Sequence, residues 1–295
     1  MAKIKVDGNT SLYALAGEYI NFSPAPEFFN LISSFTGYNS IMFPVNTENC
    51  GIIKSLDALK IIHCRGVLID TPHRCELNDY LTSISEEALN CGAVNIVKID
   101  DDGDVYGHNT EISAFRKAFP IITGEKLNDK RIFIFGCGGI ARAIAFACAL
   151  EQCKCLTIAN HNYEKAKRFC AMLNDKFDNI AYAADFNDVQ TIHSFYNADI
   201  IIQATSVGMF PQVDVQPLPE NFNFMSHHIV LDTIYNPPQT KFMRIADNRG
   251  CRAYTGRDIM FFNCFEAFQW WTDIKIDEEN EKKLFNIWKD LIYNI

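Results

Sequence analysis

A glycine-rich segment that directly follows an apolar run has the residue types and spacing of a phosphate site. Ile132-Phe133-Ile134-Phe135 leads into Gly136-Cys137-Gly138-Gly139-Ile140-Ala141, and residues 142–150 read as a helix. Gly136 permits a tight turn, Gly138 lets the backbone approach a phosphate, and Ala141 is small enough to lie beside the helix start. The N–H groups of a helix N-terminus also favour an anion. We therefore predict a dinucleotide site made by Gly136, Gly138, Gly139, Ile140 and Ala141. An ordinary turn with glycines for close packing would give the same pattern.

The end of the next predicted strand indicates which dinucleotide is preferred. Proteins that bind NAD usually have an acid about 20 residues after the glycine motif, where it binds the ribose 2′-hydroxyl. Asn160-His161-Asn162 takes that place here, and the basic residues Lys165 and Arg168 follow. Because these cationic groups suit a 2′-phosphate, the sequence favours NADP, with NAD as the alternative cofactor. A solvated helix face with ordinary basic residues is the other interpretation.

The elements around these residues alternate between strand-like and helix-like runs, which predicts an α/β fold. Before the glycine motif we predict strands at 12–16, 40–45 and 65–69, helices at 27–35 and 48–61, a hairpin of 93–99 with 105–107, and a helix at 111–119. From the motif onward we predict strands at 131–135, 156–160, 200–204 and 229–232, linked by helices. Two helices, 257–272 and 278–293, end the chain.

These elements predict two domains. Residues 1–112 and 256–295 would form an α/β domain with a mostly parallel sheet, on which the C-terminal helices pack. Residues 113–255 would form a Rossmann-type dinucleotide-binding domain.

Composition narrows the classes of function. The chain has 295 residues, 48% of them hydrophobic, and a net charge of −9. This balance argues against a nucleic-acid partner, because phosphate binding depends on clustered Lys and Arg. The N-terminal residues lack the apolar core of a signal peptide, and the most apolar stretch contains glycines and an arginine, so we expect no export and no membrane span. The eleven cysteines show no CxxC pair, and we expect reduced thiols and no metal site, with Cys153 and Cys155 facing opposite sides of one strand.

Several motifs, in order along the chain, resemble those of the shikimate/quinate dehydrogenase family. They are Ser23-Pro24, Asn30, Gly66 to Arg74, Gly92-Ala93-Val94-Asn95, Gly107-His108-Asn109-Thr110-Glu111, Gly136 to Ala143, Asn160-His161-Asn162, Ala204-Thr205-Ser206-Val207-Gly208-Met209, Tyr235-Asn236-Pro237, and Gly256 to Phe268 with Trp271-Thr272. The resemblance covers residues from about 12 to 273. It implies that the first domain binds the substrate and the second binds NADP, and that Thr205, Ser206 and Gly256 join the cofactor site.

The same resemblance exposes departures in the substrate pocket. The family's catalytic Lys and Asp correspond to Arg74 and Glu111 in this chain. Leu68 and Asp70 replace an Asn and a Thr of the family pattern, while Asn21 stands for the first carboxylate-binding serine and Asn263 for a glutamine on the closing helix. The substrate-binding candidates implied by the resemblance are Asn21, Ser23, Asp70, Asn95, Tyr235 and Asn263.

The changed pair limits which residue can move a proton. Arginine is not usefully deprotonated, so Arg74 can only stabilise negative charge. Proton transfer would then fall to Glu111, to Tyr235 or to water. Arg74 and Glu111 could instead form a structural salt bridge across a cleft between domains. For His73 and His108, which lie within the matched motifs, a structural role is the better interpretation.

The resemblance implies a cytoplasmic, NADP-preferring oxidoreductase of aromatic amino acid biosynthesis that interconverts shikimate or quinate with its 3-dehydro form. We expect a monomer or homodimer with a small-molecule substrate. Two alternatives stay open. The protein could be a divergent dehydrogenase of a related cyclic hydroxy or amino compound, or a dinucleotide-binding regulator without turnover.

Overall fold

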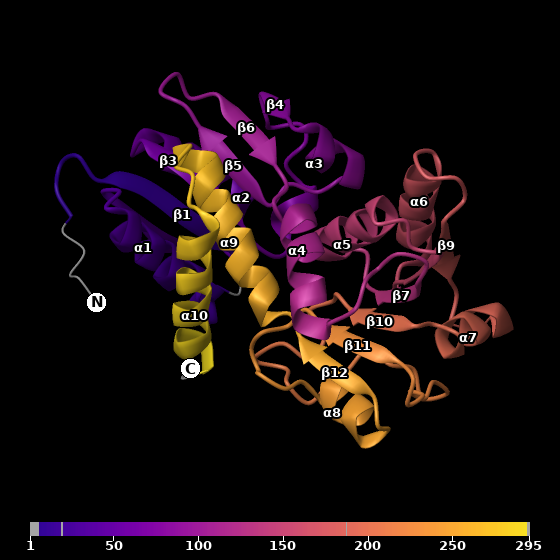
Figure 1. Ribbon diagram of the computed structural model, residues 1–295. Coiled ribbons are helices and arrows are strands. Elements are labelled where there is room, and N and C mark those ends of the chain that lie inside the picture. Colours follow the sequence, from indigo (N-terminus) through magenta and orange to yellow (C-terminus); the bar gives the residue numbers. More distant parts are fainter. Residues whose placement is uncertain (1–5, 19, 187, 294–295) are drawn as a thin grey trace. The chain divides into compact units, whose positions relative to one another are not determined.

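The computed structural model describes residues 6–18, 20–186 and 188–293, and the chain divides into two compact units. The first consists of Met1–Ala114 and Met260–Ile295, and the second is Phe115–Ile259. Helices α4 (Glu111–Thr123) and α9 (Arg257–Thr272) carry the chain from one unit to the other (Figure 1). The boundaries expected from the sequence, after residues 112 and 255, fall close to these points, while the binding role of each unit stays a prediction.

The first unit contains a six-stranded sheet in the order β2-β1-β3-β5-β6-β4. Its strands are β1 (Ser11–Gly17), β2 (Ser40–Asn46), β3 (Cys64–Ile69), β4 (Ser83–Ile84), β5 (Ile96–Ile99) and β6 (Val105–His108). The pairs β1–β2, β1–β3 and β4–β6 are parallel, whereas β5 runs antiparallel to both β3 and β6. The predicted hairpin is therefore confirmed as β5 and β6, and the sheet is mixed, with parallel pairs in the majority.

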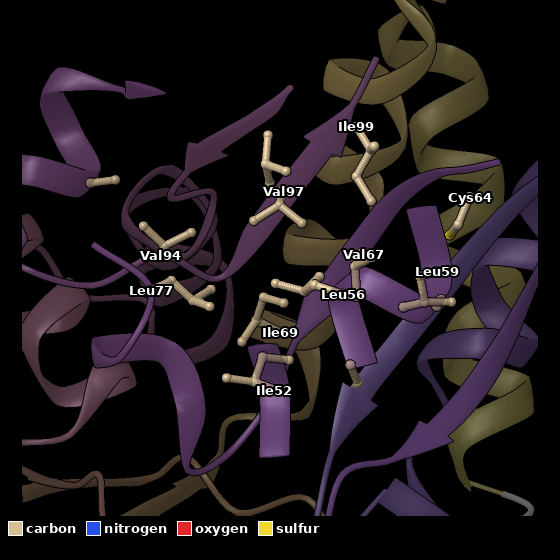
Figure 2. Close-up of a cluster of buried hydrophobic side chains, with 14 residues drawn as sticks. Ile52, Leu56, Leu59, Cys64, Val67, Ile69, Leu77, Val94, Val97 and Ile99 are labelled. Carbon is tan, nitrogen blue, oxygen red and sulfur yellow. The ribbon is translucent and has the colours of Figure 1, made fainter. Parts of the chain in front are cut away.

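Helix α2 (Gly51–Ile61) covers one face of this sheet because its apolar residues recur at helical spacing. Ile52, Leu56 and Leu59 lie on one side of the helix and are almost completely buried. They pack against Val67 of β3 and neighbouring apolar side chains (Figure 2). This cluster fixes β3, whose carboxyl end leads into the segment that carries Asp70 and Arg74.

From Met260 onward the two C-terminal helices belong to the first unit, as predicted from their apolar spacing. Phe28 of α1 (Ala25–Thr36) contacts Phe261 of α9 and Trp288 of α10 (Glu278–Tyr293), with ring centroids 5.0 and 4.9 Å apart. The indole Nε1 of Trp271 donates a hydrogen bond to the Val97 carbonyl oxygen at 2.8 Å. Helix α9 is thereby held on the sheet, which places Asn263 among the residues of this unit.

The second unit contains a parallel six-stranded sheet in the order β12-β11-β10-β7-β8-β9. Its strands are β7 (Arg131–Phe135), β8 (Cys155–Ala159), β9 (Ala181–Ala184), β10 (Ile200–Gln203), β11 (Ile229–Asp232) and β12 (Arg252–Thr255). The order reverses between β7 and β10, which is the doubly wound arrangement of Rossmann folds. The four strands predicted for this unit are present, and β9 and β12 are additional.

Four helices connect these strands and a core of phenyl rings fills one side. The helices are α5 (Gly139–Leu150), α6 (Tyr163–Asn174), α7 (Val189–Tyr196) and α8 (Lys241–Asn248). Phe133 and Phe135 are two residues apart on β7, so they share a face, where both contact Phe195 of α7. This packing holds the carboxyl end of β7, from which the glycine segment emerges.

The remaining short helix is α3 (Glu86–Cys91) in the first unit. All eleven cysteines lie in the described part of the chain, and each is a free thiol. The expectation that Cys153 and Cys155 share a strand is wrong, because β8 begins at Cys155 and Cys153 lies before it, outside the strand. Within the described residues, none of the helices has both the length and the apolar character needed to cross a membrane.

Candidate functional site

The glycine segment turns sharply at the carboxyl end of β7. Gly136 has a φ of 114°, a conformation that other residues rarely adopt, and a Cβ added there would lie 2.6 Å from the Ala204 carbonyl oxygen. A Cβ added at Gly138 would meet no described atom within 4 Å. Gly136 is therefore required by the fold itself, whereas the space beside Gly138 is open to a ligand.

Helix α5 begins at this open space with N–H groups that the helix does not use. The first internal bond of its opening turn runs from Arg142 N to the Gly138 carbonyl oxygen at 3.0 Å. The N–H groups of Gly139, Ile140 and Ala141 precede it and have no acceptor within the helix. Because ligands of doubly wound sheets bind where the strand order reverses, these donors fit a pyrophosphate.

The residues predicted to distinguish NADP from NAD lie beside the glycine segment. Asn162 caps α6 by accepting a hydrogen bond from Lys165 N at 3.0 Å, and Asn160 Nδ2 donates to the Asn162 carbonyl oxygen. The Cys137 thiol contacts the Lys165 carbonyl oxygen at 3.7 Å, so the start of α6 adjoins the glycine turn. His161 is exposed and Lys165 is half-buried. The cap thus presents two basic side chains next to the phosphate-binding turn.

The loop after β10 contains Thr205 and Ser206, and the structure gives them different surroundings. The Thr205 N–H and hydroxyl both donate to the Gln203 side-chain oxygen, at 2.8 and 2.9 Å, so they serve the loop itself. Ser206 is exposed. Only Ser206 of the pair offers its side chain to a ligand.

Gly256 and Tyr235 also belong to the second unit. Gly256 N donates to the Asp232 carbonyl oxygen at 2.6 Å, and an added Cβ would lie 2.8 Å from the Thr233 Cα atom. Its small size is therefore demanded by close backbone packing. Tyr235 is half-buried, and its carbonyl oxygen accepts a hydrogen bond from Arg257 Nε at 3.4 Å.

In the first unit, Arg74 brings Asp70 and Glu111 into one cluster. Its Nη2 atom lies 3.0 Å from Asp70 Oδ1, its Nη1 atom lies 3.2 Å from Glu111 Oε1, and its Nε atom donates to the Ile69 carbonyl oxygen at 3.0 Å. Both carboxylates belong to the same unit as the guanidinium. The alternative interpretation, a salt bridge across a cleft between domains, is therefore wrong in its location, because the ion pair is internal to the first unit.

Glu111 is the most unusual group of this cluster. Its side chain is 3% exposed, and its Oε2 atom has no hydrogen-bond partner among the described residues. Burial raises the pKa of the Glu111 carboxyl; the charge of Arg74 opposes this shift and that of Asp70 adds to it. A carboxyl with a raised pKa and an unoccupied oxygen is suited to exchange a proton with a ligand.

Asn95 and Asn263 meet in a buried network that the sequence did not predict. Asn95 Nδ2 donates to Asn263 Oδ1 at 2.7 Å, and the Thr110 hydroxyl donates to the same oxygen at 2.6 Å. Thr110 N in turn donates to Asn95 Oδ1 at 2.8 Å. The network joins α9 to the residues that directly precede β5 and α4, and so reaches the backbone next to Glu111.

The two substrate candidates nearest the N-terminus lie before helix α1. Ser23 Oγ accepts a long hydrogen bond of 3.4 Å from Ala25 N, and Asn21 is exposed. Both precede the helix rather than cap it through a strong bond, so their side chains are available to a ligand.

The histidines of the matched motifs have partners, in line with the structural role expected for them. His73 is buried and its ring nitrogens contact Thr47 Oγ1 and Glu76 Oε2, both at 2.7 Å. His108 contacts Ser85 Oγ at 2.7 Å and stacks on Trp270. Burial lowers the pKa of His108, which favours its neutral form. In the described residues no group of three or more His, Cys, Asp or Glu could hold a metal ion.

Sequence reasoning missed two buried polar residues that close the central strands of the second unit. Gln203 ends β10 and Asp232 ends β11, and both are fully buried. The Asp232 carboxylate accepts hydrogen bonds from Ile234 N at 3.0 Å and the Thr240 hydroxyl at 2.6 Å. A polar residue directly after three apolar strand residues, as in Ile200-Ile201-Ile202-Gln203, is the signal that could have found them.

The strand order and the glycine segment define a dinucleotide-binding Rossmann unit, joined in one chain to an α/β unit with a buried Arg–Glu pair. A family model described as shikimate / quinate 5-dehydrogenase matches residues 119–219. The shikimate dehydrogenase (NADP(+)) of Methanococcus aeolicus is 31% identical over 290 residues, which cover 98% of this chain and 99% of the relative. The chain belongs to the shikimate dehydrogenase family.

Solved structures agree with this assignment. A shikimate dehydrogenase in complex with NADP+ superposes with a TM-score of 0.81 at 29% identity, with 98% of each chain covered. Shikimate 5-dehydrogenase from Listeria monocytogenes, in complex with shikimate and NAD, gives a TM-score of 0.80 at 26% identity, covering 96% of this chain and 99% of that one.

Proposed function

We propose that this protein catalyses the NADP-preferring interconversion of shikimate, or quinate, with its 3-dehydro form. The observation that carries the proposal is the pairing of an open helix N-terminus at the strand-order reversal with the buried Glu111–Arg74 pair in the other unit. The first supplies a place for the dinucleotide, and the second supplies acid–base and electrostatic groups. The names of the relatives support the substrate and the cofactor.

The second unit would hold the cofactor through main-chain donors. The N–H groups of Gly139, Ile140 and Ala141 fit the pyrophosphate, and His161 with Lys165 fits a ribose 2′-phosphate. When bound, the nicotinamide supplies the acceptor for the hydride that leaves the substrate carbon.

The first unit would handle the hydroxyl proton. Arg74 is held by two carboxylates and a carbonyl oxygen, so its guanidinium is a fixed positive charge that stabilises an oxyanion but releases no proton. Glu111 is the group able to take the proton, because burial makes its carboxylate more basic and its Oε2 atom has no other partner in the described chain. In oxidation, Glu111 Oε2 accepts the hydroxyl proton while Arg74 stabilises the charge on the oxygen.

Absorbance of the reduced nicotinamide tests the proposal. Shikimate, quinate and amine-bearing analogues are each supplied with NADP or NAD, and we expect turnover of shikimate or quinate, faster with NADP. Glu111→Gln keeps the side chain's size but removes its basicity, so kcat should fall by about 100- to 10,000-fold. The dissociation constant for NADP should not change.

A matched control separates this loss from general damage. Glu266 is a part-buried acid on α9 that contacts the Ser113 hydroxyl, and Glu266→Gln should keep kcat within a few-fold of wild type. If Glu111→Gln keeps wild-type kcat, the proton passes through another group. If neither shikimate nor quinate is oxidised with either cofactor, the proposed function is wrong.

One observation favours a second candidate, a related cyclic hydroxy or amino compound. Two carboxylates, Asp70 and Glu111, face the single guanidinium of Arg74. A substrate with an ammonium group would balance the second acid, whereas a second anion nearby would be repelled. Preferential turnover of the amine-bearing analogue would select this candidate, and NADP binding without any turnover would select a regulatory protein. We also propose a cytoplasmic location and a monomeric or homodimeric state, in keeping with the family.

A further inference from the structure

The loop after β10 borders the place where the strand order of the second unit reverses. Strands β7 and β10 are parallel neighbours, with Phe135 paired to Gln203, so the segments that follow them emerge at the same edge. The Gly136 Cβ position lies within 3.1 Å of both the Ala204 carbonyl oxygen and the Thr205 methyl group. The β10 loop and the glycine turn are therefore in contact at the point where doubly wound sheets bind their ligands.

The buried side chain of Gln203 bonds to the backbone of this loop. Its side-chain oxygen accepts hydrogen bonds from the N–H and the hydroxyl of Thr205, at 2.8 and 2.9 Å. Its side-chain nitrogen donates to the carbonyl oxygens of Val207 at 2.8 Å and Thr205 at 3.3 Å. The amide is completely buried, and its oxygen and its nitrogen each make two bonds to the loop. One side chain thus fixes the backbone from Thr205 to Val207.

The bonding pattern determines what the loop can present to a ligand. Val207 N donates to the Thr205 hydroxyl oxygen at 3.1 Å, and Met209 N donates to the Ser206 carbonyl oxygen at 3.1 Å. The polar groups of Thr205 and Val207 are therefore occupied inside the loop, while Ser206 and the half-exposed Val207 side chain face outward. Without the amide of Gln203, these buried main-chain groups would have to find partners elsewhere.

We propose that Gln203 is a positioning residue for the dinucleotide site, because it holds the loop 205–207 in a fixed shape against the glycine turn. The inference rests on the proposed binding of NADP by this unit. Its effect is indirect: Gln203 is buried under the loop and acts through the backbone that it braces. A loop that is already ordered loses no further conformational freedom when the dinucleotide binds.

The test replaces the amide and measures NADP affinity directly. Gln203→Met keeps the length of the side chain but removes all four bonds, and Gln203→Asn is too short to reach both Thr205 and Val207. Titration calorimetry should show an NADP dissociation constant raised by at least about tenfold, since ordering even one backbone residue on binding is enough for that factor. The KM for NADP should rise in parallel, while the KM for shikimate should not, because its predicted binding groups are mainly in the first unit.

Asn174 provides the matched control, because its side chain also bonds backbone in the second unit, but at the amino end of a strand and not at the carboxyl end where Gln203 lies. Its amide bonds both ways with Ala181 at the start of β9, at 2.8 Å in each direction. Asn174→Leu should lower the melting temperature without changing the NADP dissociation constant.

The outcomes separate the two proposals. Wild-type NADP affinity in Gln203→Met would overturn the positioning role, and so would an equal loss of affinity in Asn174→Leu. If Gln203→Met does not fold, wild-type affinity in Gln203→Asn overturns it equally. If the wild-type protein binds neither NADP nor NAD, the proposed function itself is wrong, whatever the Gln203 variants show.

Discussion

Replacing the buried Asp232 should change how the stability of the protein depends on pH. Burial raises the pKa of the Asp232 carboxyl to about 7, against the hydrogen bonds from Thr240 and from Ile234 N, which favour its ionised form. An ordinary Asp in the unfolded chain has a value of 3.8. The folded protein therefore binds a proton that the unfolded chain has released between about pH 4 and 7. Because the folded-state pKa is raised, this contribution is fully present at low pH and is lost as the pH rises through 7.

The size of the effect follows from the shift. About three pKa units at about 1.4 kcal/mol each give about 4 kcal/mol of stability that Asp232 loses between pH 4 and 8. Asp232→Asn stays neutral throughout and loses one acceptor, at a cost of about 1–3 kcal/mol that does not depend on pH. The free energy of unfolding of the variant, relative to that of wild type, should therefore rise by about 4 kcal/mol over this pH range. The variant should be the more stable protein at pH 8.

Urea unfolding of both proteins at several pH values measures this difference. Asp199 is a useful control: burial raises its pKa, but the hydrogen bonds and charge of Arg131 outweigh burial and leave it below the ordinary value. Because its pKa is lowered, Asp199 stays ionised at neutral pH, and the stability difference between Asp199→Asn and wild type should be flat from pH 5 to 8. A difference between Asp232→Asn and wild type that is equally flat would refute a protonated, buried Asp232.

Two further predictions concern the candidate site. Restoring the family pair with Arg74→Lys and Glu111→Asp together should raise kcat/KM for shikimate by about tenfold or more if the pocket suits shikimate, because misplacing a catalytic group by about 1 Å costs on the order of a hundredfold. Each single change should do less, since the two groups act as a unit. His161→Ala should raise the dissociation constant for NADP by about two- to fivefold, as expected for an exposed ion pair, and leave that for NAD unchanged.

Each of these predictions has a clear contrary result. If the double variant gains nothing while the wild type oxidises another hydroxy acid, Arg74 and Glu111 are adapted to that other substrate. For the cofactor, His193 is an exposed histidine of α7 outside the predicted site, and His193→Ala is the matched control. An equal change in NADP affinity for both histidine variants would remove His161 from the site, and tighter binding of NAD than of NADP by the wild type would refute the preference for NADP.

The fold could be predicted from the sequence wherever apolar periodicity is strong. Strand β7 and the helices α9 and α10 have the bounds that the sequence indicates, because long amphipathic or fully apolar runs leave little choice. The edge strands β9 and β12 were missed. Each has four residues, and Ala181-Tyr182-Ala183-Ala184 shows neither alternation nor β-branched residues. Such strands form because a neighbouring strand offers unpaired N–H and C=O groups, which local sequence does not reveal.

The candidate site, too, could be predicted only where its requirements are local in sequence. The glycine turn was predictable because its requirements are local: a positive φ at Gly136 and a close approach to Ala204. The network of Asn95, Thr110 and Asn263 was not, because it joins residues up to 168 positions apart in the chain. Motif resemblance named two of these residues as ligands of a substrate, but only the folded structure reveals that they bind one another.

We interpret Arg74 and Glu111 as having separate roles, one for charge and one for the proton. A lysine next to an aspartate can itself gain and lose a proton, whereas arginine keeps its proton at any physiological pH, so our proposal assigns the proton exchange to Glu111. Two contacts support this proposal: Arg74 lies against Glu111 Oε1, and Oε2 has no partner among the described residues. Asp70 then has a clear role, because it holds the guanidinium from the other side and adds negative charge that raises the pKa of Glu111. In this proposal the three residues that depart from the family pattern act as one acid–base cluster. Asp70→Asn should therefore lower the pH at which kcat/KM for oxidation reaches half its maximum.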